Sequence, residues 1–210
     1  MAKPILYIKQ RRISAGRHTV EMNMFDWSDY ITERITTAPQ GAIFVETGTY
    51  NAQSLIYFLE QSFLLGRTDL KIFTCDVFDG TTVQPKPCIY NVAQAIKIYE
   101  MRYKEDAFKR CSIMQCDALK LAGYFADGEV YHVFLDDNHE LNHVTAELEA
   151  WYPKVAEGGF IAGHDYANYP QWQNMDVIPA VDGFVAKNNL TLNVVDKNSF
   201  SIVKPFKKKK

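Results

Sequence analysis

The sequence predicts an α/β fold: a seven-stranded, mostly parallel sheet with helices on both faces and a C-terminal antiparallel hairpin. Apolar runs typical of strands buried on both faces alternate with segments of helical periodicity. The last two apolar runs, at 190–195 and 200–203, flank a turn-forming cluster at 196–199, which indicates a hairpin. Acidic residues follow several of the runs, at the end of the sheet where open α/β folds bind ligands.

Each apolar run is followed by a segment with helical spacing, as a parallel sheet requires. Leu141, Val144, Leu148 and Trp151 show the i, i+3, i+4 pattern of a helix with one buried face. The expected strands are 42–46, 71–76, 112–116, 130–135 and 159–163, and the expected helices are 52–65, 90–109, 118–125, 140–156 and 177–188.

The chain is predicted to form a single domain over 1–210, with a core at 41–203. Residues 1–40 hold a strand-like run at 5–9, a polar stretch at 11–18 and a helical segment at 26–36. This N-terminal extension is either a lid over the sheet's edge or an extra layer packed on the sheet. Residues 204–210 form a basic tail, and its Lys207 to Lys210 run is expected to be solvated.

Composition limits the classes of partner. The chain has 210 residues, 47% hydrophobic, with a formal net charge of −2, so it gives no global field for nucleic acid and favours a small-molecule substrate. No signal peptide, 18-residue apolar stretch or Cys-x-x-Cys pair is present. We therefore expect a reduced, cytoplasmic protein without membrane contact; a homo-oligomer stays open.

Two neighbouring segments carry the clearest chemical signal. The run 130–135 leads into Asp136 and His139, and the run 159–163 leads into His164 and Asp165. Adjacent parallel strands end at the same edge of a sheet, so these four side chains are expected around one crevice.

A glycine-containing turn follows the run at 42–46. Gly48 stands alone where a dinucleotide site would have G-x-G-x-x-G, which argues for a ligand without a diphosphate. Asp76 ends the next run and suits a pair of ribose hydroxyls. Asp117, followed by small Ala118, suits an adenine amino group beside a flat ring. Each acid alone also fits a helix N-cap or a turn.

Residues 41–203 resemble a class I S-adenosylmethionine-dependent methyltransferase with a Rossmann-like core. The stretches 136–139, 149–154 and 158–166 resemble a narrower group, the metal-dependent sugar O-methyltransferases and cephalosporin-hydroxylase-like proteins. The resemblance implies S-adenosylmethionine as cofactor, with Glu46 and Gly48 at its methionine end.

The resemblance also implies a Mg²⁺ site formed by Asp136, His164 and Asp165. Members of the group usually supply two oxygen ligands in the second pair, and His164 departs from this pattern. Imidazole suits softer metals than Mg²⁺, so either Mn²⁺ or Fe²⁺ is preferred or His164 is not a ligand. His139 occupies the position of the histidine base in related sugar methyltransferases; the alternative is an exposed histidine that caps the helix.

The resulting expectation is an O-methyltransferase acting on a small-molecule hydroxyl, such as a sugar or glycan precursor, with divalent-metal assistance. One rival is the same fold binding its cofactor without methyl transfer, or with hydroxylase chemistry. Another is a zinc peptidase, because residues 139–143 read H-E-x-x-H, although the extended motif fails at Ala146 and Glu149. The aromatic loop at 166–172 is either a ring-stacking surface or a loop packed on the sheet edge.

Overall fold

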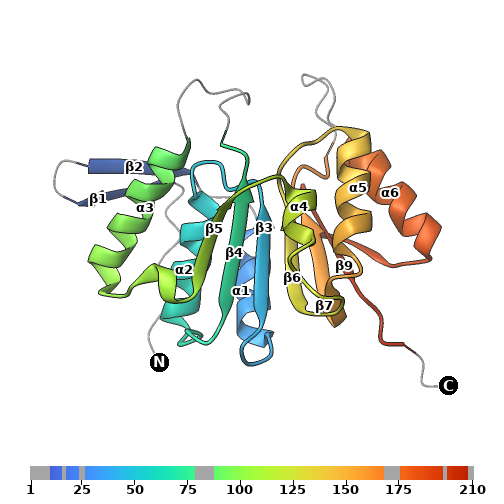
Figure 1. The fold of residues 1–210 in the computed structure, drawn as a ribbon, viewed down its shortest axis with the longest axis horizontal. Helices are drawn as coiled ribbons and strands as arrows, with labels where there is room; N and C mark the ends of the chain where they lie inside the picture. The colour runs from blue at the N-terminus through green and yellow to red at the C-terminus, as the bar shows by residue number, and fades with distance from the viewer. Residues whose placement is uncertain are drawn as a thin grey trace.

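The computed structural model describes residues 10–15, 18–23, 27–78, 88–167, 176–195 and 198–207. Its centre is a seven-stranded sheet in the order β5-β4-β3-β6-β7-β9-β8 (Figure 1). The five strands from β5 to β7 are parallel, and β9 is antiparallel to both of its neighbours. The predicted sheet and C-terminal hairpin are confirmed. In sheet order the strands are β5 (Cys111–Gln115), β4 (Lys71–Asp76), β3 (Ile43–Thr47), β6 (Val130–Leu135), β7 (Val155–Gly163), β9 (Ser199–Val203) and β8 (Leu192–Val195).

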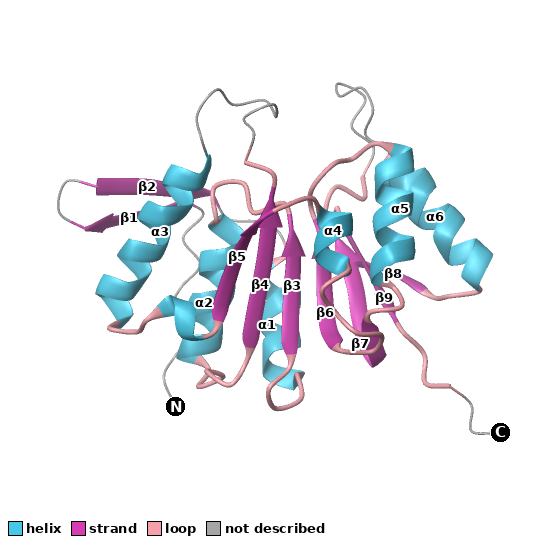
Figure 2. Ribbon diagram, viewed as in Figure 1, coloured by secondary structure: helices cyan, strands magenta, loops and turns pink. Residues whose placement is uncertain are grey.

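Helices cover both faces of the sheet (Figure 2). One hydrophobic core joins the sheet to α1 (Ser28–Thr37), α2 (Gln53–Leu64) and α3 (Cys88–Tyr103). The other joins it to α4 (Ala118–Ala122), α5 (Leu141–Trp151) and α6 (Val177–Asn188). Phe44 and Val45, successive residues of β3, enter opposite cores, as the alternation of a strand requires. None of the described helices is long and apolar enough to cross a bilayer.

The N-terminal extension contributes directly to the core. Trp27, Ile31 and Ile35 are fully buried, and the Trp27 ring stacks on Phe134 of β6 at 4.1 Å. Residues 27–37 are therefore a layer packed on the sheet, not a lid. The described part of the polar stretch expected at 11–18, residues 11–15 and 18, belongs to an antiparallel pair of strands, β1 (Gln10–Ala15) and β2 (His18–Asn23), that packs against α3. The strand expected at 5–9 lies outside the described residues.

Three predicted helices extended too far at their C-terminal ends. The helix expected at 118–125 ends at Ala122. The helix expected at 90–109 ends at Tyr103, because Lys104 has a φ of 55°, and a separate 3-10 turn covers Ala107–Lys109. The helix expected at 140–156 ends at Trp151, because the chain enters β7 at Val155, four residues before the strand was expected.

The start of the predicted basic tail is packed against the fold. Lys204 Nζ donates hydrogen bonds to the carbonyl oxygens of Tyr152, Pro153 and Val155 at 2.9, 3.1 and 2.7 Å. The Phe206 ring lies against Gly158, so closely that a Cβ there would be 2.6 Å from it. Lys204 thus satisfies the carbonyl groups that follow α5. Lys208 to Lys210 lie outside the described residues.

Candidate active site

The turn after β3 is held close to the end of β6 by a glycine. Gly48 has a φ of 82°, and a Cβ at this position would lie 2.6 Å from the carbonyl carbon of Asp136. The backbone N–H of Asp136 donates to the Thr47 carbonyl oxygen at 3.1 Å, and Gly48 N–H donates to Cys75 at 2.9 Å. Only a residue without a side chain lets these three strand ends converge.

Glu46 points into the protein at the end of β3. Its side chain is 2% exposed, and its Oε2 accepts a hydrogen bond from the Thr74 hydroxyl at 2.9 Å. Burial raises the pKa of Glu46 to about 8, although hydrogen bonds from Ser54 and Thr74 act in the opposite direction. A buried carboxyl with unused acceptor capacity suits a cationic or hydrogen-bond-donating ligand group.

The two acids predicted to hold a nucleoside follow neighbouring strands. Asp76 accepts hydrogen bonds from the backbone N–H groups of Tyr50 and Phe78, each at 2.8 Å, and so ties the turn after β3 to β4. Asp117 is the N-cap of α4 and accepts from Leu119 N–H at 2.8 Å. Both acids thus fill the turn and cap roles that the sequence left open. Their remaining lone pairs can still accept from a ligand.

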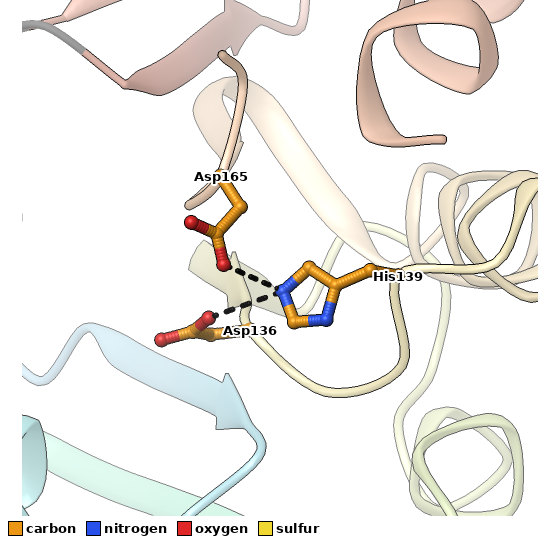
Figure 3. A group of neighbouring side chains, drawn as sticks. All are labelled: Asp136, His139 and Asp165. Atoms are coloured by element: carbon orange, nitrogen blue, oxygen red, sulfur yellow. Dashed lines mark ion pairs between the residues drawn. The ribbon is translucent and has the colours of Figure 1, made fainter. Parts of the chain in front are cut away.

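Asp136, His139 and Asp165 meet where β6 and β7 end (Figure 3). The Nε2 atom of His139 lies 2.8 Å from Asp165 Oδ2 and 3.8 Å from Asp136 Oδ1, so this edge of the imidazole ring faces both carboxylates. Each of the three offers a ligand atom, and these atoms lie within 4.8 Å of one another. The predicted convergence of Asp136, His139 and Asp165 is present.

Electrostatics in this group follow from burial and pairing. Burial raises the pKa of Asp136 to about 6, with Asp165 adding to the rise. Burial would also raise the pKa of Asp165, but bonds from His139 and His164 hold it below its usual range. Burial alone would lower the pKa of His139, yet its pairing with Asp165 and the charge of Asp136 raise it.

His164 also faces these carboxylates. Its Nδ1 atom lies 3.4 Å from Asp165 Oδ1 and 3.8 Å from Asp136 Oδ1, and its Nε2 lies 3.2 Å from Asn198 Nδ2. If that amide nitrogen donates to Nε2, the ring proton is on Nδ1 and no lone pair faces the carboxylates. With the Asn198 amide reversed, Nδ1 could bind a metal. His164 is within reach, and its tautomer decides whether it is a ligand.

The residues of the H-E-x-x-H motif do not form a zinc-peptidase site. His139 lies before α5, whose first residue is Leu141 and whose N-cap is Glu140. His139 faces Asp165, whereas His143 faces Asp137 and Glu147, so the two imidazoles belong to different clusters. His139 and His143 therefore do not form the zinc site of an H-E-x-x-H peptidase, in which both histidines bind the same metal ion.

Several features of the site gave no signal in the sequence. Backbone strain is one: Tyr50, Ala52, Phe78 and Asp165 adopt positive φ directly after β3, β4 and β7, and such strain clusters at functional sites. Another is the buried pair of hydroxyls from Thr49 and Thr74, 2.5 Å apart, next to Glu46. These depend on three-dimensional packing, so no residue pattern could have shown them.

The aromatic loop expected at 166–172 is described only at its start. The Tyr166 hydroxyl donates to Asp182 of α6 at 2.7 Å, and the Tyr166 ring packs 6.0 Å from Phe200. Tyr166 is therefore held against α6 and β9, and residues 168–172 lie outside the described residues.

The sheet order, with one antiparallel strand inserted near its end, and the acids at successive strand ends define a class I methyltransferase fold. A family model described as a methyltransferase domain matches residues 45–166, and the chain belongs to this family. It is an S-adenosylmethionine-dependent methyltransferase. No curated protein matches the sequence significantly.

Solved structures share the fold at low sequence identity. CalS11, described as a TDP-rhamnose 3'-O-methyltransferase in calicheamicin biosynthesis, has a TM-score of 0.61 at 14% identity, over 84% of this chain and 76% of CalS11. The O-methyltransferase NovP has a TM-score of 0.60 at 16% identity, over 86% of this chain and 80% of NovP. A putative rRNA-methylase from Clostridium thermocellum has a TM-score of 0.60 at 12% identity, over 85% and 97%.

Proposed function

We propose that this methyltransferase transfers the methyl group to a hydroxyl of a small molecule, such as a sugar or glycan precursor, with the help of a divalent metal. The observation that carries the proposal is the meeting of Asp136, His139 and Asp165 beside the Gly48 turn. Acceptor activation needs a cation to hold the alkoxide and a base to remove the hydroxyl proton. The two carboxylates can bind the cation, and the imidazole can act as the base.

The cofactor is proposed to lie along the strand ends from β3 to β5. Glu46 and Gly48 take its methionine end, Asp76 its ribose and Asp117 with Ala118 its adenine. The order of these residues across the sheet supports the assignment, because β3, β4 and β5 are consecutive neighbours. Ala118 is the first residue of α4 and directly follows Asp117, and its small side chain is consistent with a flat ring nearby.

The metal is proposed to bind Asp136 and Asp165, with His164 as a third ligand. The donor set fits, because two clustered carboxylates lie together with Glu46 nearby. Burial raises the pKa of both Asp136 and Glu46, and neighbouring carboxylates add to the rise. Oxygen donors suit Mg²⁺ or Mn²⁺, and the imidazole of His164 as a ligand would favour Mn²⁺. The bound cation would lower the pKa of the acceptor hydroxyl.

His139 is proposed as the general base. With a cation facing Asp136 and Asp165, these carboxylates no longer need the imidazole as their positive partner, and its neutral form can accept a proton at Nε2. The acceptor oxygen then bonds to the methyl carbon, the carbon–sulfur bond of the sulfonium breaks, and S-adenosylhomocysteine is the second product. Asp136 lies in contact with His139 and so also takes part in catalysis by orienting the ring.

Other parts of the proposal concern the surroundings of the enzyme. The near-neutral charge supports a small acceptor over nucleic acid or a membrane surface. The free, buried thiols of Cys75 and Cys111 support a cytoplasmic location. We also propose that the protein can form a homo-oligomer.

A methyl-transfer assay with a panel of sugar and glycan-precursor hydroxyl acceptors tests the function. His139→Ala should lower turnover by roughly 10²–10⁴ and leave S-adenosylhomocysteine affinity nearly unchanged in calorimetric titration. Glu140→Gln is the control and should keep its turnover, because Glu140 is next to His139 but has no part in the proposed methyl transfer. A zinc peptidase would need Glu140 as its base. Full turnover in His139→Ala would contradict the base assignment, and cofactor binding without transfer to any acceptor would favour the non-methylating rival.

A further inference from the structure

A second cluster of metal-ligating side chains lies between α5 and the end of β6, and we call it the α5 triad: Asp137, His143 and Glu147. His143 and Glu147 are one turn apart on α5, and Asp137 follows β6. His143 Nε2 lies 3.5 Å from Asp137 Oδ2 and 3.6 Å from Glu147 Oε2. The three ligand atoms lie within 4.8 Å of one another, in a group separate from Asp136, His139 and Asp165.

The spacing of the triad does not fit direct hydrogen bonds. Ordinary N–H···O bonds are about 2.7–3.2 Å long, and His143 Nε2 has no hydrogen-bond partner among the described residues. Ligand atoms around a tetrahedral zinc ion, bound at about 2.0–2.1 Å, are about 3.3–3.4 Å apart. The two His143 distances are therefore close to those of a three-residue metal site with its fourth position open.

Buried polar atoms beside the triad point in the same direction. Glu147 is 1% exposed, and its Oε1 has no hydrogen-bond partner within the described structure. The Thr47 hydroxyl is fully buried at the end of β3, next to Glu147. Leaving a buried carboxylate oxygen such as Glu147 Oε1 unsatisfied is costly, and a cation bound by Glu147 would offset that cost.

We propose that Asp137, His143 and Glu147 bind a divalent metal of the zinc class, with water as the fourth ligand. The site is structural: it joins α5 to the segment after β6 and so fixes the backbone of the neighbouring Asp136. A small pocket next to the triad is lined by Asp137 and Glu147, and also by Asp136, His139 and His164 of the first site. This site is independent of the proposed function, because it shares no ligand with the acceptor-activating metal.

The test uses the full chain, which is first stripped of metal with a chelator and then dialysed against Zn²⁺; bound zinc is measured by elemental analysis. The parent protein for this test carries Asp165→Asn, which weakens the first site, and every variant is made in it. The parent should retain one zinc per chain, and its melting temperature should rise with Zn²⁺. His143→Ala should lower zinc affinity more than roughly 100-fold. Loss of a residue that only hydrogen-bonds to a metal ligand lowers affinity by up to about 100-fold, and loss of a ligand itself should lower it further. Asp137→Asn, nearly isosteric, should do the same if His143→Ala fails to fold.

Glu149→Gln is the matched control, because Glu149 lies on α5 but is exposed and pairs with Lys187. It should keep its zinc. Co²⁺ in place of Zn²⁺ should give a tetrahedral visible spectrum that Asp137→Asn abolishes. A parent chain that binds no zinc would overturn the proposal and leave His143 as a protonated bridge between two carboxylates. Unchanged zinc content in both Asp137→Asn and His143→Ala would also overturn it.

Discussion

Replacing Gly48 by alanine should damage the site more than any other conservative change to its backbone. The substitution has two costs. A residue with a Cβ at a φ of 82° loses about 1–2 kcal/mol relative to glycine. The added Cβ would also lie 2.6 Å from the carbonyl carbon of Asp136 and 3.0 Å from Asp137 N, so backbone must shift, at about 1–3 kcal/mol for forced overpacking.

Gly66→Ala separates these two costs. Gly66 has a φ of 70°, but a Cβ there would meet nothing within 4 Å, so this variant should lose only the conformational part. Chemical denaturation should show a free energy of unfolding about 1–3 kcal/mol lower for Gly48→Ala than for Gly66→Ala. A melting temperature lower by about 2–4 °C per kcal/mol should accompany it.

Function should separate the two variants further. Because the Gly48 turn touches the backbone of Asp136, Gly48→Ala should weaken S-adenosylhomocysteine binding in calorimetry, whereas Gly66→Ala should not. Equal stability and equal cofactor affinity in the two alanine variants would refute the view that close approach of β3 and β6 builds this site.

Three further outcomes are expected. Asp76→Ala should weaken S-adenosylhomocysteine binding about ten- to hundredfold in calorimetry, because a charge-assisted hydrogen bond to the ribose is lost. Asp106→Ala, which removes the N-cap of the 3-10 turn at Ala107–Lys109, should leave the affinity unchanged, and equal affinities in the two variants would reject the ribose placement. Chelation should abolish turnover but spare cofactor binding, and His164→Asp should shift the metal preference towards Mg²⁺ in activity assays; turnover that survives chelation would exclude the metal. Burial lowers the pKa of His132 to about 3 in the folded protein, whereas an unperturbed histidine has a pKa of about 6.5. Between these pH values the imidazole is protonated only in the unfolded chain, so the free energy of unfolding should fall as the pH drops from about 6.5 towards 3. His132→Phe should flatten this dependence in denaturation curves; an unaltered slope would mean that other groups cause it.

Much of the fold was readable from the sequence because its signals are local. The alternation of apolar runs and helical periodicity predicted each sheet strand, and the turn at 196–199 predicted the hairpin. What the sequence left open depends on non-local packing. Trp27 joins α1 to the core through Phe134, and Lys204 holds the carbonyl groups after α5; neither contact is visible in local periodicity.

For the site, sequence position was enough to bring residues together but not to assign their partners. Asp136, His139 and Asp165 converge because β6 and β7 are adjacent. That His139 pairs with Asp165, and that His143 turns instead to Asp137 and Glu147, depends on where α5 begins. A motif match over 139–143 could not separate these clusters, because it assumes one continuous helix.

The most direct test of the proposed chemistry is a crystal of the protein grown with S-adenosylhomocysteine and Mn²⁺, measured at a wavelength where manganese scatters anomalously. The account predicts an anomalous peak between the carboxylates of Asp136 and Asp165, with the sulfur of the cofactor facing the same crevice and Asp76 on the ribose. Density for water alone between Asp136 and Asp165, with the cofactor bound, would contradict metal-assisted methyl transfer at this site.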